Sequence, residues 1–229
     1  MKKLSVTTAD GVTVELEQST IVDLFHELYY DSKVWGNTFW FGNQILKCPL
    51  DMWVYQELFF EIKPDVVVEC GSFKGGSALF YANLFDLMGK GHVVSVDVER
   101  YPNLPVHPRI TYVTGSSTDP EISNAIAHAI GPNKCVAVIL DSDHSRDHVL
   151  AEMRTYASFV NPGSYMIVED SNVNGHPTRP DFGPGPMEAI DLFLQENDQF
   201  EIDRSKEKFY MTLNPRGYLK KKLPTTNLL

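Results

Sequence analysis

The sequence predicts an α/β fold built on a seven-stranded sheet, in which five parallel strands are completed by a C-terminal antiparallel hairpin. Short apolar runs rich in valine and isoleucine alternate with segments of helical spacing from about residue 65 onward. Continuous apolar runs of this length are typical of parallel strands that helices cover on both faces. The alternation stops near residue 199, where two extended segments follow one another.

Five apolar runs mark the expected parallel strands, and each ends in glycine, serine or an acid. They cover residues 64–72, 92–99, 109–116, 135–141 and 164–170. The segments between them carry helix signals, such as the Asp-Pro start and glycine stop of DPEISNAIAHAIG. We expect helices over residues 77–89, 119–131, 146–159 and 186–197.

The two ends of the chain depart from this pattern. Residues 199–205 and 206–214 are expected to pair as the antiparallel hairpin, and the basic stretch RGYLKKK falls in a solvated tail, residues 216–229. Residues 1–64 predict a small hairpin, a helix with Ser19 as N-cap, and an irregular aromatic stretch. This segment is too short for a good core of its own. We therefore expect a lid or packing element over 1–64 and the folded core over 65–215.

Composition limits the classes of partner. The 229 residues carry a net charge of −10, and 43% of them are hydrophobic. An acidic surface argues against nucleic acid or an anionic membrane as the main partner. The three cysteines are far apart, which disfavours disulfides and a zinc site and fits a reducing compartment. We expect a cytoplasmic homo-oligomer that acts on a small molecule or glycan.

The turn ECGSFKGGS, residues 69–77, closes the first parallel strand and opens a helix. Its glycines predict a ligand held near free amides of the helix N-terminus, although a tight turn alone would also use them. Asp97 ends the second strand, where an acid can accept both hydroxyls of a ribose. NAD and S-adenosylmethionine both fit this arrangement. Glu69 favours the second, because a carboxylate repels a pyrophosphate but not a sulfonium or an ammonium group.

Acidic residues also follow the fourth and fifth strands. Asp141 comes after one run, and Glu169 and Asp170 come after the next. If these strands are neighbours, their carboxylates converge, and convergence raises carboxyl pKa values unless a cation intervenes. Oxygen ligands of this kind suit Mg²⁺. The alternative is that Asp141, Ser142 or Asp170 caps a helix.

Three histidines lie near these acids. His144 is one helical turn beyond Asp141 and is our candidate for the general base, because an imidazole changes charge near neutral pH. The alternatives for His144 are a helix cap and a metal ligand, although Mg²⁺ binds histidine poorly. His148 is expected to face outward. His176 lies in the Pro/Gly-rich stretch 173–186, which is either a substrate-binding loop or an ordinary connector.

Three stretches resemble one known family: residues 47–84, LDSDHS at 140–145, and residues 163–190. They are similar to the cephalosporin hydroxylase/rhamnosyl O-methyltransferase family, which includes macrolide-sugar enzymes that need magnesium and S-adenosylmethionine. The resemblance covers roughly residues 35–213 and implies a class I methyltransferase, Rossmann-like fold. It implies Asp141, Glu169 and Asp170 as metal ligands, with Asp143 as a possible alternative first ligand, and His144 as base.

The donor pocket and the activity follow from the same resemblance. We expect cofactor contacts from Glu69, Gly71, Ser72, Gly76, Ser77, Asp97, Ser116 and Asp143, and a substrate contact from His176. The predicted activity is O-methylation of a sugar or natural-product glycoside hydroxyl. The alternatives are a non-catalytic nucleotide- or sugar-binding protein of this fold and a metal-dependent hydroxylase. A hydroxylase of that kind usually needs two histidines and one carboxylate.

Overall fold

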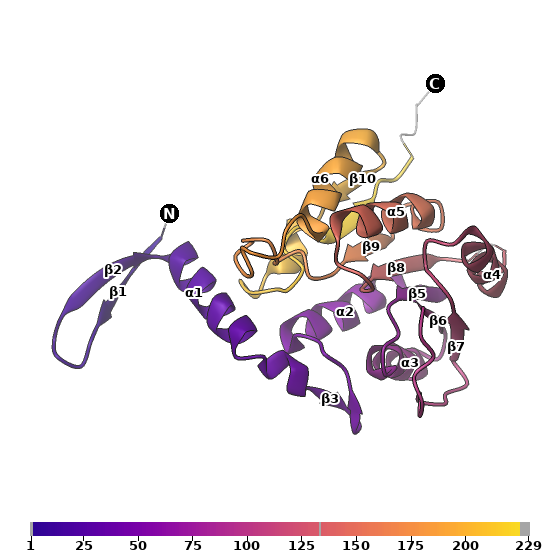
Figure 1. Cartoon of the computed structure of the whole chain (residues 1–229), viewed down its shortest axis with the longest axis horizontal. Coiled ribbons are helices and arrows are strands. Elements are labelled where there is room, and N and C mark those ends of the chain that lie inside the picture. The colour runs from indigo at the N-terminus through magenta and orange to yellow at the C-terminus, as the bar shows by residue number, and fades with distance from the viewer. Residues whose placement is uncertain (1, 133, 225–229) are drawn as a thin grey trace.

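A seven-stranded sheet runs through the protein in the order β10-β11-β9-β8-β5-β6-β7 (Figure 1). The structure is a computed structural model that describes residues 2–132 and 134–224. Five strands are parallel, and β11 runs antiparallel to both β9 and β10. The strands are β5 (Val66–Cys70), β6 (His92–Asp97), β7 (Ile110–Thr114), β8 (Val136–Leu140), β9 (Tyr165–Val168), β10 (Phe200–Ile202) and β11 (Tyr218–Lys221). The predicted fold class is confirmed.

The strand order reverses direction between β5 and β8. From β5 the chain moves outward through β6 to β7, then returns to the other side of β5 and continues through β8 to β9. The carboxyl ends of these five strands all meet at one edge of the sheet. A crevice for a ligand forms at such a switch point, because the connections diverge there to opposite sides.

Helices cover both faces of the sheet (Figure 1). One face carries α4 (Pro120–Ile130), α5 (Arg146–Tyr156) and α6 (Pro186–Glu196), and the other carries α2 (Pro49–Ile62) and α3 (Gly76–Met88). Successive β5 residues face opposite layers: Val66 and Val68 pack toward the first group, and Val67 toward the second. This two-sided burial explains the continuous valine run. The helices predicted from the sequence are confirmed, apart from shifts at their ends.

The position of the last strand was predicted wrongly. Residues 206–214 contain the end of a short 3₁₀ helix, η2 (Arg204–Glu207), and irregular chain, whereas β11 lies within the predicted tail. Tyr218 and Leu219 are fully buried, and the Lys221 ammonium group donates to the Ala157 carbonyl oxygen at 2.9 Å. The lysines of this strand thus keep their charged ends at polar groups while the backbone completes the sheet. The lysines of β11 made this segment resemble a solvated tail, although it pairs antiparallel with both β9 and β10.

The N-terminal segment is of two kinds. Residues 45–62, including α2, belong to the core, since Ile45, Tyr55, Leu58 and Phe59 pack against the sheet and α3. Helix α2 was not predicted from the sequence, and because it packs in the core, the division at residue 64 cuts through that core. The hairpin and helix of residues 3–31 form an arm that extends from the body (Figure 1), whereas Trp40 already packs against the core.

The arm consists of the predicted hairpin and helix. Strands β1 (Lys3–Thr7) and β2 (Thr13–Glu17) pair antiparallel, and α1 (Gln18–Asp31) follows directly. Ser19 lies inside this helix, whose N-cap position is Glu17, so the predicted Ser19 cap is wrong. The 3₁₀ helix η1 (Val34–Asn37) and the short pair β3 (Phe39–Trp40) and β4 (Asn43–Gln44) lead from the arm to α2. Within residues 2–132 and 134–224, no helix has the length and apolar character needed to cross a bilayer.

The buried carboxylate of Asp51 on α2 fixes the approach to β11. It accepts hydrogen bonds from the Thr212 hydroxyl at 2.5 Å, the Leu213 amide at 2.9 Å and the Tyr218 hydroxyl at 2.8 Å. All four residues are buried. One side chain therefore satisfies three donors that water cannot reach.

We predict that Asp51→Ala lowers the free energy of unfolding by about 2–4 kcal/mol, because three buried donors lose their acceptor. Chemical denaturation monitored by circular dichroism measures this loss. The matched control is Asp23→Ala, an exposed aspartate on α1. An Asp51→Ala protein as stable as the control would show that these hydrogen bonds do not hold the C-terminal strand.

Candidate active site

A cavity of about 610 Å³ opens at the carboxyl edge of the parallel strands. The turns after β5, β6, β7, β8 and β9 contribute to its wall, together with the segment before α2. This is the crevice that the reversal of strand order predicts. Its lining includes the predicted Gly71, Ser72, Gly76, Ser77, Asp97, Asp141, Asp143, His144 and Asp170.

The glycines of the turn after β5 permit close packing of backbone. Gly71 has φ of +100°, and a Cβ atom built there would lie 2.0 Å from the Asp141 carbonyl oxygen. A Cβ at Gly76 would lie 2.1 Å from the Gln44 carbonyl oxygen. These two glycines therefore admit the chain after β8 and the chain before α2, in addition to shaping the cavity.

Asp97 at the end of β6 lines the cavity and is held by backbone amides. Its two oxygens accept hydrogen bonds from the Phe73 amide at 2.8 Å and the Glu99 amide at 3.0 Å. A carboxylate oxygen has two acceptor sites, so each retains capacity for another donor. The side chain is thus oriented in advance, with lone pairs left for a pair of hydroxyl groups.

Two residues predicted to contact S-adenosylmethionine, Glu69 and Ser116, do not line the cavity. Glu69 is fully buried and accepts a hydrogen bond from the Ser95 hydroxyl at 2.5 Å; burial raises its pKa to about 7. Ser116 instead lies 3.0 Å from the Thr118 hydroxyl, and Ser117 takes its place in the wall. The expectation that Glu69 lines the pocket is wrong, because its side chain turns from the strand into the protein interior.

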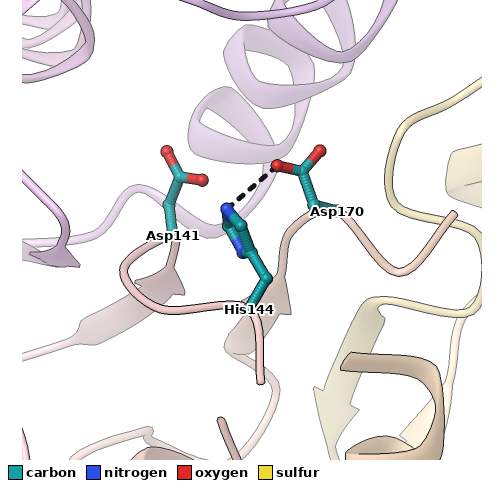
Figure 2. A group of neighbouring side chains, drawn as sticks. All are labelled: Asp141, His144 and Asp170. Carbon is teal, nitrogen blue, oxygen red and sulfur yellow. Dashed lines mark ion pairs between the residues drawn. The ribbon is translucent and has the colours of Figure 1, made fainter. Parts of the chain in front are cut away.

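A compact group of three side chains lies in the cavity wall at the carboxyl edge of the sheet: Asp141, His144 and Asp170 (Figure 2). One potential ligand atom from each lies within 4.8 Å of the others, and His144 Nε2 is 3.1 Å from Asp170 Oδ2. Both carboxylates point toward the imidazole (Figure 2). The group forms because β8 and β9 are parallel neighbours, with Leu140 opposite Val168, so that the residues following each strand meet.

The backbone around Asp170 is shaped to present this carboxylate. Asp170 has φ of +52°, a conformation that aspartate tolerates better than most residues. Its amide donates to the Asn214 side-chain oxygen at 3.1 Å, which secures the turn after β9. Burial raises the pKa of Asp170, and the nearby His144 opposes that shift.

Glu169 lies beside this group but faces another way. Its Oε1 atom is 2.6 Å from Lys47 Nζ and 2.9 Å from the Tyr55 hydroxyl, which donates to it. Lys47 Nζ also lies 2.5 Å from Asp141 Oδ2. Burial and the charge of Asp141 raise the pKa of Glu169. Although burial alone would lower the pKa of Lys47, Asp141 and Glu169 together raise it well above its usual range.

The helix-cap alternative for these acids is not met. The N-cap residue of α5 is Ser145, whose amide donates to Asp143 at 2.7 Å. The Ser142 hydroxyl donates to Glu152 at 2.6 Å. The chain after Asp170 enters a series of turns. Asp143 therefore supports the start of α5 and lines the cavity, outside the group of Asp141, His144 and Asp170.

The prediction that His148 faces outward is wrong. It lines the cavity, with Nε2 3.3 Å from the Ser117 hydroxyl and 3.5 Å from Glu152 Oε1. Glu152 is fully buried and also accepts a hydrogen bond from Ser117. The hydrogen bond with Glu152 raises the pKa of His148. The helical start of α5 turns this residue back toward the sheet edge.

His176 is not in the cavity wall. Its Nε2 atom lies 2.9 Å from Glu188 Oε1 at the start of α6. The loop that carries it is also tied to the arm, because His26 Nε2 lies 3.0 Å from the Asn172 side-chain nitrogen. The structure thus places His176 against the first turn of α6, outside the cavity wall.

Sequence reasoning missed several cavity residues contributed by the N-terminal segment. Tyr30 at the end of α1, Trp35 in η1 and Leu46 before α2 all line the cavity. Lys47 adjoins it through Asp141. A single residue in an irregular stretch shows no periodic pattern. Only the tertiary structure shows that these residues reach the cavity.

Comparison with known proteins identifies the family. The family model for rhamnosyl O-methyltransferase/CmcI matches residues 32–222. The chain belongs to this family. The rhamnosyl O-methyltransferase of Mycobacterium tuberculosis (strain H37Rv) is 41% identical over 207 residues, which cover 87% of this chain and 84% of that protein. That of Mycobacterium leprae is 42% identical over 210 residues, covering 89% and 91%. The protein is accordingly an O-methyltransferase, and the resemblance seen in the sequence is confirmed.

Solved structures share the fold. A CmcI structure described as "cmcI-D160 Mg-SAM" has a TM-score of 0.62 and 20% sequence identity, over 82% of this chain and 78% of that chain. The MycE methyltransferase in complex with Mg, SAH and mycinamycin VI has a TM-score of 0.56 at 18% identity, over 76% of this chain and 50% of that chain. Both confirm the class I methyltransferase architecture.

Proposed function

We propose that the protein transfers a methyl group from S-adenosylmethionine to a hydroxyl group of a sugar or natural-product glycoside, with magnesium as cofactor. The observation that carries this is one cavity that contains both the Asp97 side of the sheet edge and the Asp141–His144–Asp170 group. A donor and an acceptor can therefore meet within it. The name of the rhamnosyl relatives supports a sugar acceptor, and the MycE methyltransferase complex with mycinamycin VI supports a natural-product acceptor.

The donor is assigned to the β5–β6 side of the cavity. Asp97 would accept the ribose hydroxyls, and Gly71, Ser72, Gly76 and Ser77 would border the rest of the molecule. Asp143 lies on the same wall. Glu69 and Ser116 act behind the surface in this proposal, since neither lines the cavity.

The acidic group fits a magnesium ion. Asp141 and Asp170 supply oxygen atoms of the kind that Mg²⁺ prefers, and Glu169 adjoins them as the proposed third carboxylate. When bound, the ion supplies a Lewis acid that stabilises negative charge on a substrate oxygen. The excess of carboxylates over the single Lys47 ammonium group leaves the site suited to a divalent cation.

His144 is the proposed general base. Its Nε2 atom is directed toward Asp170 at 3.1 Å, which orients the ring within the cavity wall. The imidazole takes the proton of the acceptor hydroxyl while the oxygen attacks the methyl carbon. The carbon–sulfur bond of the donor breaks, its electron pair stays on sulfur, and the products are the methyl ether and S-adenosylhomocysteine. The protein's main contribution besides this proton transfer is to hold the two reactants in line.

The two alternative functions are less well supported. A non-catalytic binding protein would not require an imidazole beside the two aspartates at the cavity wall. A metal-dependent hydroxylase usually combines two histidines with one carboxylate, whereas this group combines one histidine with two carboxylates. Membership of an O-methyltransferase family favours methyl transfer over both alternatives.

The cellular setting remains a prediction. We propose a cytoplasmic enzyme, and the three free cysteines, Cys48, Cys70 and Cys135, support a reducing compartment. We also propose a homo-oligomer. The arm supports this, because one face of its hairpin exposes Leu4, Val6 and Val14, and isolated two-stranded hairpins are only marginally stable.

We predict that Asp97→Ala weakens S-adenosylmethionine binding by more than about tenfold, since charge-assisted hydrogen bonds contribute roughly 1.5–3 kcal/mol each. Isothermal titration calorimetry with the purified protein measures the change. Glu99→Ala is the control, because that exposed side chain lies two residues away and outside the cavity wall. Equal affinities for the two variants would refute the donor assignment.

We predict that EDTA abolishes methyl transfer and that added Mg²⁺ restores it, because the acidic group needs a cation to receive a substrate oxygen. Asp170→Ala should lose turnover while keeping donor affinity within a few-fold. Transfer of an isotopically labelled methyl group to a rhamnosyl glycoside, followed by mass spectrometry, provides the assay. The control is Asp181→Ala, an exposed aspartate of the neighbouring loop. Full activity in excess EDTA would contradict the metal assignment.

We predict that His144→Ala lowers kcat by about 10²–10⁴. Donor affinity should change little, because a base contacts the acceptor rather than the donor. His128→Ala on the exposed side of α4 is the control. Single-turnover kinetics, calorimetry and thermal unfolding on the same preparations separate chemistry from folding. A His144→Ala protein with a lowered melting temperature but near-normal turnover would assign the residue to structure.

A further inference from the structure

The ammonium group of Lys47 has no part in the reaction described above, yet it lies between the carboxylates of Asp141 and Glu169. Its side chain is 3% exposed, and Nζ is 2.5 Å from Asp141 Oδ2 and 2.6 Å from Glu169 Oε1. Burying a lysine is costly unless the charge is paired. These two ion pairs provide that pairing.

Lys47 reaches this position from outside the parallel sheet's own connections. It lies between β4 and α2, where Leu46 adopts φ of +53° and Gly76 lets the chain pass close to the start of α3. The carboxylates come from elsewhere, since Asp141 follows β8 and Glu169 follows β9. The contact therefore joins three separate parts of the chain at one point.

The net charge of Lys47 and the nearby carboxylates determines how many cations the site can bind. When ionised, Asp141, Glu169 and Asp170 bring three negative charges, and Lys47 returns one positive charge. The remaining excess matches one divalent cation. Lys47 is bound to two of the three carboxylates proposed as ligands, so it holds them in place and at the same time opposes the approach of a second cation.

We propose that Lys47 is a positioning residue of the metal site: a built-in cation that keeps Asp141 and Glu169 in place in the metal-free protein and weakens the affinity for Mg²⁺. The inference rests on the proposed function, because it concerns the same site. It explains how carboxylates can converge in a protein that has not yet bound its metal. It also predicts that Lys47 and Mg²⁺ act against each other in binding while both stabilise the fold.

The test compares wild type with Lys47→Met, which keeps the length of the side chain and removes its charge, and with Lys47→Arg, which keeps the charge. Calorimetry should show that Lys47→Met binds Mg²⁺ about tenfold or more tightly than wild type, because a nearby like charge is gone. In EDTA its melting temperature should fall below that of wild type, and saturating Mg²⁺ should raise it by more than it raises the wild-type value. Lys47→Arg should remain close to wild type in Mg²⁺ affinity.

A second variant guards against misfolding. If Lys47→Met does not fold in EDTA, the double variant Lys47→Met/Glu169→Gln restores the balance of charge and should fold without metal. Wild-type Mg²⁺ binding combined with equal or weaker binding by Lys47→Met would overturn the role of Lys47 alone. A double variant that fails to fold would overturn it as well, since packing rather than charge would then be decisive. If wild type does not bind Mg²⁺ at all, the proposed metal-dependent function fails first.

Discussion

Repulsion between like charges at the carboxyl edge of the sheet is the constraint on which the rest of this structure depends. Parallel strands end together, so Asp141 after β8 meets Asp170 after β9, and Glu169 lies against the same Lys47 ammonium group as Asp141. Such convergence is unfavourable unless positive charge compensates it. The protein supplies part of that charge itself through Lys47 and leaves the remainder to a cation. The orientation of each acid follows from this division.

The same constraint explains why the N-terminal segment is so closely joined to the core. Helix α2 carries Tyr55, whose hydroxyl donates to Glu169, and Asp51, which holds the chain leading into β11. Asn214 in turn donates to the Tyr55 hydroxyl. The acids are thus oriented by hydrogen bonds from elements at both ends of the sequence. Preorganisation of this kind is what positions a functional group accurately.

Features that depend on local sequence were predictable, and features that depend on long-range pairing were not. The valine runs predicted β5 to β9, and the acids at the ends of β8 and β9 predicted the Asp141–Asp170 contact. Strand β11 was missed because its lysines resemble a solvated tail, although Leu219 is fully buried. Helix α2 and Lys47 were missed because aromatic residues and a single lysine show no clear period.

The direction of the side chains at the site also lay beyond the sequence. Spacing placed His148 one turn after His144, but the path of the chain into α5 decides that both face the cavity. Glu69 shows the converse case, since its strand position suggested a pocket wall while its carboxylate turns inward to Ser95. Motifs identify which residues gather at an edge, and packing determines which way each one points.

The route of residues 44–48 has a practical consequence for protein engineering. Any excised catalytic module that begins at the first parallel strand would leave Asp141 and Glu169 without their lysine and β11 without its anchor on α2. If the site were grafted onto another Rossmann-like scaffold, that scaffold would need an equivalent segment that brings a lysine to the carboxylates. A design that transfers this active site should therefore include the segment from Gln44 through Ile62.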